Sequence, residues 1–240
     1  MKTTPDALTA LIGQRVDLID TPALVVDLDA MDRNIQRMAD FARKHQVRWR
    51  PHAKMHKSAE LALLLQQAGA VGACVQKTAE AEALVAGGVT DVYISNEVVA
   101  LPKLERIARM ARSLQAQNGQ IASAVVSLEG SHRLAAALDV VGASMRVFVE
   151  IDVGQNRCGV QPGAPAVALA QEVLRHPQLH FAGLQAYHGK AQHLRSAAAR
   201  AGAIQHVVQA VRSTRALIEA AGIPVELVTG AGAAYGLHHV

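Results

Sequence analysis

The chain has 240 residues, half of them hydrophobic, and a formal net charge of +4. This length and composition allow one substantial core and exclude a disordered chain. Because the Lys and Arg residues are scattered and aromatic residues make up only 3% of the chain, we expect no nucleic-acid partner.

The cysteines and the apolar runs indicate the compartment. Cys74 and Cys158 lie far apart without CxxC spacing, which argues against a zinc knuckle or a disulfide scaffold. No apolar run has the length of a signal-peptide core or of a membrane span. We therefore expect a cytoplasmic protein with no membrane partner.

The first predicted elements are a strand and a helix, which we place within residues 18–46. Thr21–Asp27 is apolar and typical of a strand. Asp29 is expected to cap the helix that follows, since Asp is a preferred residue before a helical apolar stripe. That stripe consists of Met31, Ile35, Met38 and Ala42.

From residue 47 onward, short apolar segments alternate with helical ones. The predicted strands are 47–54, 72–76, 91–96, 121–127, 146–152, 179–187 and 224–229. Near-continuous apolar strands that alternate with helices predict a parallel sheet buried on both faces. We therefore expect one α/β domain over residues 1–240, with seven βα repeats over 47–232. A closed (β/α)8 barrel of the TIM type has eight strands.

A basic segment, Arg50–Ser58, lies where the first barrel strand meets its helix, which we expect over Ala59–Gln67 with Gly69 at its end. Catalytic groups of parallel barrels lie at this end of the strands. If the strand geometry continues, His52, Lys54 and His56 share one face. Crowding of such groups on a partly buried face favours loss of the lysine proton, which suits Lys54 to Schiff-base chemistry. The alternative is a solvated basic turn.

Polar residues also lie at or just after the C-terminal ends of the other predicted strands. They are Gln76, Ser95, Asn96, Asp152, Arg157, Tyr187 and His188. The carboxyl ends of parallel barrel strands converge on one mouth. A single polar residue at a strand end is ordinary, but their coincidence at successive strands indicates a site.

A glycine-containing loop, Thr229, Gly230, Ala231 and Gly232, follows the last predicted strand. Barrels often bind phosphate in this position, where small residues let backbone N–H groups approach the anion. An ordinary glycine turn is the alternative. Together, Lys54 and this loop would hold a phosphorylated aldehyde, a description that pyridoxal 5′-phosphate (PLP) meets.

The segment Arg50–Lys57 resembles the lysine motif of the D-threonine aldolase family. With alanine racemase and D-serine dehydratase, that family forms the barrel group (fold type III) of PLP enzymes. The resemblance covers residues 18–232, with several further motifs in matching order. They are Asp20–Asp27, Val75–Glu82, Ile94–Val98, Ile151–Gly154, Arg157–Gly159, Gln185–Gly189, Gln192–His193 and Val228–Gly232.

The resemblance implies an enzyme that cleaves D-threonine and related D-3-hydroxy amino acids to glycine and an aldehyde. It implies that Lys54 attaches the cofactor, that Gln76, Arg157 and Tyr187 lie near the cofactor or substrate, and that the Thr229–Gly232 loop is part of the phosphate site. We expect His193 to accept the proton of the β-hydroxyl, because a neutral imidazole is available at pH 7. The alternative is an exposed histidine at the start of a helix.

After Gly232 the family pattern would continue into an eighth strand and a β-domain that supplies a His/Asp pair for Mn²⁺ or Mg²⁺. Here we expect neither the strand nor the β-domain, since the sequence ends at Val240. His238 and His239 are adjacent and would face opposite ways on a strand, so we do not take them for the metal pair. We therefore expect a truncated chain with no metal ligands and with weak or absent catalysis. The alternative to truncation is that the tail or a second subunit, in a homodimer, covers the gap in the barrel.

Two other functions are kept as alternatives. One is a D-serine dehydratase or amino-acid racemase of the same fold. The other is a non-catalytic PLP-binding barrel.

Overall fold

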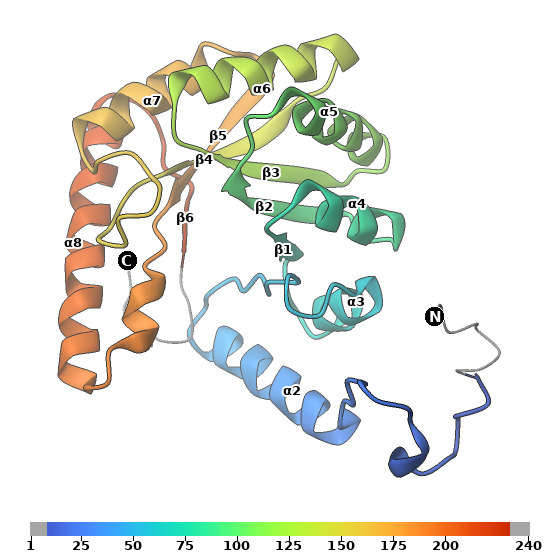
Figure 1. The fold of residues 1–240 in the computed structure, drawn as a ribbon. Helices are drawn as coiled ribbons and strands as arrows, with labels where there is room; N and C mark the ends of the chain where they lie inside the picture. The colour runs from blue at the N-terminus through green and yellow to red at the C-terminus, as the bar shows by residue number, and fades with distance from the viewer. Residues whose placement is uncertain (1–8, 231–240) are drawn as a thin grey trace.

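The computed structural model describes residues 9–230, and its centre is a parallel sheet of six strands. The strands are β1 (Ala73–Val75), β2 (Asp91–Glu97), β3 (Gln120–Val125), β4 (Met145–Glu150), β5 (Leu179–Gln185) and β6 (Leu227–Thr229). Each strand pairs in parallel with the next one along the chain. The sheet forms part of a barrel, with the helices on its outside (Figure 1), as the alternating pattern predicts.

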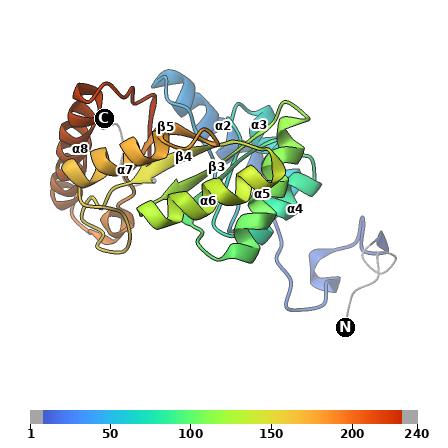
Figure 2. The same ribbon diagram turned by 90° about the horizontal axis from the view of Figure 1, so that it is seen from above.

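The helices follow the strands in the order expected of βα repeats. They are α2 (Leu28–Lys44), α3 (Ala59–Gln67), α4 (Thr78–Ala86), α5 (Leu101–Gln115), α6 (Leu128–Val141), α7 (Ala164–Leu174) and α8 (Ala197–Ala220), with short 3₁₀ helices η1 (Val16–Leu18) and η2 (Gly189–His193). Ser58, Ser127 and Ser196 cap α3, α6 and α8 by accepting a backbone N–H three residues on, which stabilises each helix start. Seen from above, α3 to α7 follow one another around the sheet (Figure 2).

The sheet separates two apolar regions, because side chains alternate between its faces. Val92 and Ile94 are fully buried against the outer helices. Tyr93, between them, faces the barrel interior and packs with Phe148, with ring centroids 5.0 Å apart. The strands therefore hold the helices on one side and a lined interior on the other.

The first predicted strand, Thr21–Asp27, does not form. Its apolar side chains are exposed, Leu24 by 92%, and no strand among residues 9–230 pairs with it. A strand needs such a partner for its backbone N–H and C=O groups. The predicted cap at Asp29 is also wrong, since Asp27 accepts the Ala30 N–H at 2.9 Å and α2 begins at Leu28.

The first barrel strand, predicted over residues 47–54, is reduced to a single parallel bridge between His52 and Cys74. Pro51 accepts the Cys74 N–H at 2.8 Å, but a proline has no N–H to donate. The chain then turns, and the Lys57 N–H donates to the Ala53 carbonyl at 2.7 Å. The shared face expected for residues 52, 54 and 56 is therefore not formed, because the strand geometry ends at His52.

Candidate functional site

Lys54 lies in the turn that follows the bridge at His52, and it is exposed. Burial lowers the pKa of His52, the hydrogen bond to Gln76 opposes that change, and the charge of Lys54 adds to the lowering. Burial raises the pKa of the Cys74 thiol, and the charge of Lys54 is among the influences that oppose this rise. The ammonium group thus lies close enough to the inner side of β1 to act on both groups.

His52 and Gln76 join the Lys54 turn to the sheet. The Lys54 N–H donates to His52 Nδ1 at 3.2 Å, so the proton of the neutral ring is on Nε2, which donates to Gln76 Oε1 at 3.3 Å. Gln76 Nε2 in turn donates to the Ser95 carbonyl at 3.4 Å. Both ends of the Gln76 amide are therefore bonded to the protein, and Gln76 supports the turn. Its direct contact with a cofactor stays a prediction.

Arg157 and Tyr187 come together from the segments that follow β4 and β5. The Arg157 guanidinium carbon lies 5.7 Å from the centroid of the Tyr187 ring, within the range of a cation–π contact. The Tyr187 hydroxyl accepts Gln192 Nε2 at 3.0 Å. These contacts hold a cationic group at the mouth of the barrel.

A chain of hydrogen bonds runs from the barrel interior to this cation. The Tyr93 hydroxyl donates to Gln185 Oε1, and Gln185 Nε2 donates to Glu150 Oε2. The Cys158 thiol donates to Glu150 Oε1 at 3.2 Å, and Arg157 Nε donates to Cys158 Sγ at 3.4 Å. The chain links β2, β5 and β4 to the loop that carries Arg157.

Glu150 is a buried acid at the centre of that chain. Burial raises its pKa to about 7, with a further rise from neighbouring Glu97, while hydrogen bonds from Cys158 and Gln185 oppose the rise. Two carboxyl groups that share a site cannot both ionise readily. Glu150 can therefore hold or release a proton near neutral pH.

Gly230 lies where β6 leaves the sheet, with a φ of +142°. A Cβ atom at this position would overlap the backbone of Ala186, whose N–H donates to the Thr229 carbonyl at 2.8 Å. Packing of β6 against β5 thus requires glycine here, whatever binds nearby. The predicted phosphate role of the loop stays untested, and Ala231 and Gly232 lie outside the described residues, as do His238 and His239.

His193 is the last residue of η2 and is exposed. Among residues 9–230, no hydrogen bond joins the side chain of Lys54 or of His193 to another predicted site residue. The structure thus brings His52 to Gln76 and Arg157 to Tyr187, but it leaves the two predicted catalytic groups unconnected.

Tyr93, Gln185 and Glu150 are functional candidates that the sequence reading missed. Each is a polar residue within an otherwise apolar strand, and each is buried. Period-two alternation carries this signal, because inward positions of a barrel strand share one parity. These three residues were missed because only polar residues at the C-terminal ends of the strands were taken as candidates.

A cavity of about 780 Å³ lies in the barrel interior, where the sheet does not close. Tyr93 and Phe148 line it, together with residues 47–51 on one side and residues 227–230 on the other. Residues 47–51 precede the Lys54 turn, and Thr229 and Gly230 begin the predicted phosphate loop, so the chain enters both segments from the wall of this hollow. Lys54 itself is not among the lining residues.

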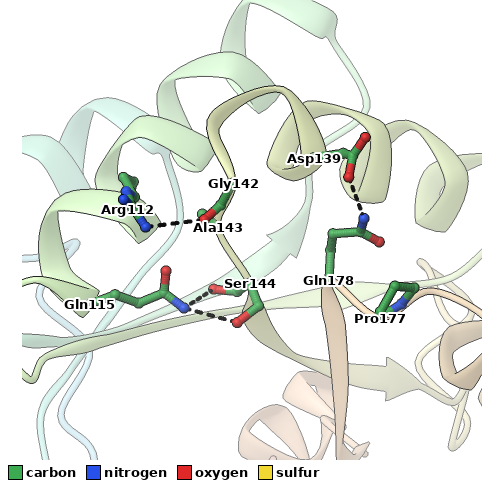
Figure 3. A pocket seen from close by; sticks show the side chains of 8 residues that line it. All are labelled: Arg112, Gln115, Asp139, Gly142, Ala143, Ser144, Pro177 and Gln178. Carbon is green, nitrogen blue, oxygen red and sulfur yellow. Dashed lines mark hydrogen bonds between the residues drawn. The ribbon is translucent and has the colours of Figure 1, made fainter.

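A second hollow, of about 510 Å³, lies at the amino-terminal ends of β4 and β5 (Figure 3). Its polar side chains bond within its own wall: Gln115 Nε2 donates to Ser144 Oγ at 2.9 Å, and Gln178 Nε2 donates to Asp139 Oδ1 at 2.6 Å. This wall resembles a structural joint between helices and strands more than a ligand site.

Two groups of side chains among the described residues are close enough to hold a metal ion. Glu97, Glu150 and Cys158 form one at the mouth, and the other is formed by His132, Glu172 and His176 on the outer helices. In this part of the chain, no helix is both long and apolar enough to span a membrane.

Comparison with known proteins gives a family match over most of the chain. Residues 26–239 match the family described as "Alanine racemase, N-terminal domain". A D-threonine aldolase of Arthrobacter sp is 40% identical over 92% of this chain. A 3-hydroxy-D-aspartate aldolase of Paracoccus denitrificans (strain Pd 1222) is 38% identical over 94% of it. The chain spans 57% of the length of each of these relatives.

The fold is likewise similar to that of a solved structure. The crystal structure of D-threonine aldolase from Filomicrobium marinum superposes with a TM-score of 0.83 at 43% identity, covering 87% of this chain and 55% of that one. The similarity supports the parallel-barrel architecture that the strand pattern predicts.

Proposed function

The chain belongs to the family of the alanine racemase N-terminal domain, and we propose that it cleaves D-threonine or related D-3-hydroxy amino acids to glycine and an aldehyde, with PLP as cofactor. The observation that carries this proposal is an exposed lysine, Lys54, three residues beyond Pro51, where the chain leaves the wall of the open interior of a parallel barrel. Relatives named as aldolases at about 40% identity support the reaction.

The residues at the mouth fit the cofactor. Lys54 offers an amine to its aldehyde, Arg157 offers a guanidinium to an anionic group, and Gly230 leaves the backbone without a side chain at the end of β6. An amine, a cation and a small-residue loop are the donor set that a phosphorylated aldehyde requires. We therefore assign the attachment to Lys54 and the phosphate to residues 229–232.

When bound, PLP withdraws electrons from the bonds at the substrate Cα. The remaining work falls to side chains of this chain. Arg157, against the Tyr187 ring, is placed to bind a carboxylate, and His193 is our candidate to accept the β-hydroxyl proton. Gln76 and His52 keep the Lys54 turn in place. A single domain over residues 1–240 would hold all these groups.

The test uses purified protein with added PLP and D-threonine, with and without Mn²⁺. Retro-aldol cleavage gives glycine and acetaldehyde, whereas a dehydratase gives ammonia and a 2-oxo acid, and a racemase changes only the configuration. We expect glycine and acetaldehyde in equal amounts. Release of ammonia in their place would contradict the aldolase.

Attachment of the cofactor is measured separately from catalysis. Lysine-bound PLP absorbs near about 420 nm, and Lys54→Ala should abolish this band. Lys57→Ala is the matched control, because Lys57 lies three residues away and its Nζ pairs with Glu80 at 2.5 Å. A band that persists in Lys54→Ala would reject the assignment. A band without turnover in the wild type would favour the non-catalytic barrel.

A further inference from the structure

Two histidines and a glutamate meet on the outer surface of the barrel, away from the groups used above. His132 lies on α6, Glu172 lies near the end of α7, and His176 lies in the turn after α7. The two helices run next to each other in the outer layer (Figure 1). His132 Nε2 lies 2.7 Å from Glu172 Oε1, and His176 Nε2 lies 3.3 Å from the same oxygen.

We propose that His132, Glu172 and His176 bind a divalent transition-metal ion of the Zn²⁺ type between α6 and α7. The three ligand atoms lie within 4.8 Å of one another. In a tetrahedral zinc site, with bonds of about 2.0–2.2 Å, neighbouring ligand atoms lie ~3.3 Å apart. The His176–Glu172 spacing of 3.3 Å already matches this value. The His132–Glu172 spacing of 2.7 Å would have to open by about 0.6 Å to admit the ion.

The carboxylate is already held in place. Arg175 Nη1 donates to Glu172 Oε2 at 2.9 Å, so Oε1 is the oxygen directed to the imidazoles. The Glu172 side chain is 12% exposed, whereas that of His132 is 54% exposed. The glutamate is thus an anchored ligand, and the half-exposed His132 side leaves room for water to complete the coordination.

The two imidazoles are also oriented toward each other. The His132 and His176 rings meet edge to face, with centroids 5.1 Å apart. Glu172 and His176 are four residues apart, the spacing that places two side chains on one helical face. The ligands thus come from two packed segments, and a bound ion would join α6 to α7.

The donor types select the ion. Two imidazole nitrogens and one carboxylate oxygen suit Zn²⁺, Ni²⁺ and Cu²⁺, whereas Mg²⁺ and Ca²⁺ prefer all-oxygen sites. In the metal-free protein the Nε2–H groups bond to Glu172. To bind the ion through Nε2, each neutral imidazole must carry its proton on Nδ1 instead, and a doubly protonated ring cannot bind the ion. Binding should therefore weaken at acid pH. None of this depends on the proposed reaction.

The experiment titrates ZnCl₂ into the untagged, PLP-loaded protein by calorimetry and records the electron paramagnetic resonance of added Cu²⁺. The variants are His132→Asn, His176→Asn and, as a matched control, His180→Asn, which removes an exposed histidine of β5. Circular dichroism checks that each variant is folded.

We expect one ion per chain, with coupling of Cu²⁺ to two nitrogens, in the wild type and in His180→Asn. Loss of either ligand should weaken this binding at least about ten-fold. Zn²⁺ should raise the melting temperature of the wild type but not that of a protein that carries both His132→Asn and His176→Asn. Two results would overturn the proposal. One is no binding by the wild type. The other is wild-type affinity in both His132→Asn and His176→Asn, which would place the ion elsewhere.

Discussion

Gly230 shows how one residue connects packing to the site. Its φ of +142° is unfavourable for any residue with a side chain, and a Cβ atom would overlap the Ala186 backbone. Gly222 also has a positive φ, of +79°, but an added Cβ would meet nothing within 4 Å. The two glycines therefore separate the cost of backbone strain from the cost of steric overlap.

We expect Gly230→Ala to lower the free energy of unfolding clearly more than Gly222→Ala, which should cost only the backbone strain of about 1–3 kcal/mol. Urea unfolding of the PLP-free proteins measures both changes. Because no cofactor is present, the result reports packing alone. Equal losses in the two variants would show that β6 can move away from Ala186.

At the scale of elements, Glu150 connects β4 to β5 and to the Arg157 loop. Its pKa is raised from 4.5 to about 7, chiefly by burial. A group whose pKa is raised on folding stabilises the fold fully below its unfolded pKa, and this contribution is lost as the pH rises through the folded pKa. Glu150 should therefore make the protein less stable as the pH rises from about 5 to 8.

Glu150→Gln should remove that part of the pH dependence, on the order of 2–3 kcal/mol. Urea unfolding from pH 5 to pH 8 measures the difference between variant and wild type at each pH. Glu129→Gln is the control, because Glu129 is an exposed acid paired with Arg133 on α6. A constant difference across this range would contradict an acid that titrates near neutral pH.

The elements show what could be predicted from the sequence and what could not. Helix α3 has the predicted bounds, Ala59–Gln67, because its cap, Ser58, and its stop, Gly69, are local signals. The strand at 21–27 failed because its formation depends on a partner that local pattern does not reveal.

The site residues likewise divide into those that the sequence pattern predicts and those that only the assembled fold defines. Arg157 and Tyr187 were predicted to lie near one mouth, and the parallel topology brings them together. The turn at Lys54 was missed because it begins after the last hydrogen bond to β1, from the Ala53 N–H to the Cys74 carbonyl, and only the assembled sheet defines that end point. The link from Tyr93 through Gln185 to Glu150 joins residues up to 92 positions apart, so only the assembled sheet defines it.

For the whole molecule, the main structural question is what covers the apolar residues at the open side of the barrel. Leu24, Val25 and Val26 are exposed beside α2, and contiguous apolar surface of this kind marks an interface. We expect a second copy of the chain to cover it. Light scattering coupled to size exclusion should then give a dimer, and Leu24→Asp with Val26→Asp should give a monomer.

Val140→Asp is the control for this prediction, since Val140 is 86% exposed on the opposite, helical side. It should leave the dimer intact. A monodisperse wild-type monomer would contradict the prediction.

Borohydride reduction followed by mass spectrometry is the most direct test of whether Lys54 attaches PLP at the mouth of this barrel. Reduction makes the link between lysine and cofactor permanent, and a modified Lys54 blocks trypsin. We expect a phosphopyridoxyl group on the peptide Trp49–Lys57, with Lys54 uncleaved and no adduct in Lys54→Ala. An adduct on Lys57, Lys77 or another lysine, or none in PLP-loaded protein, would contradict it.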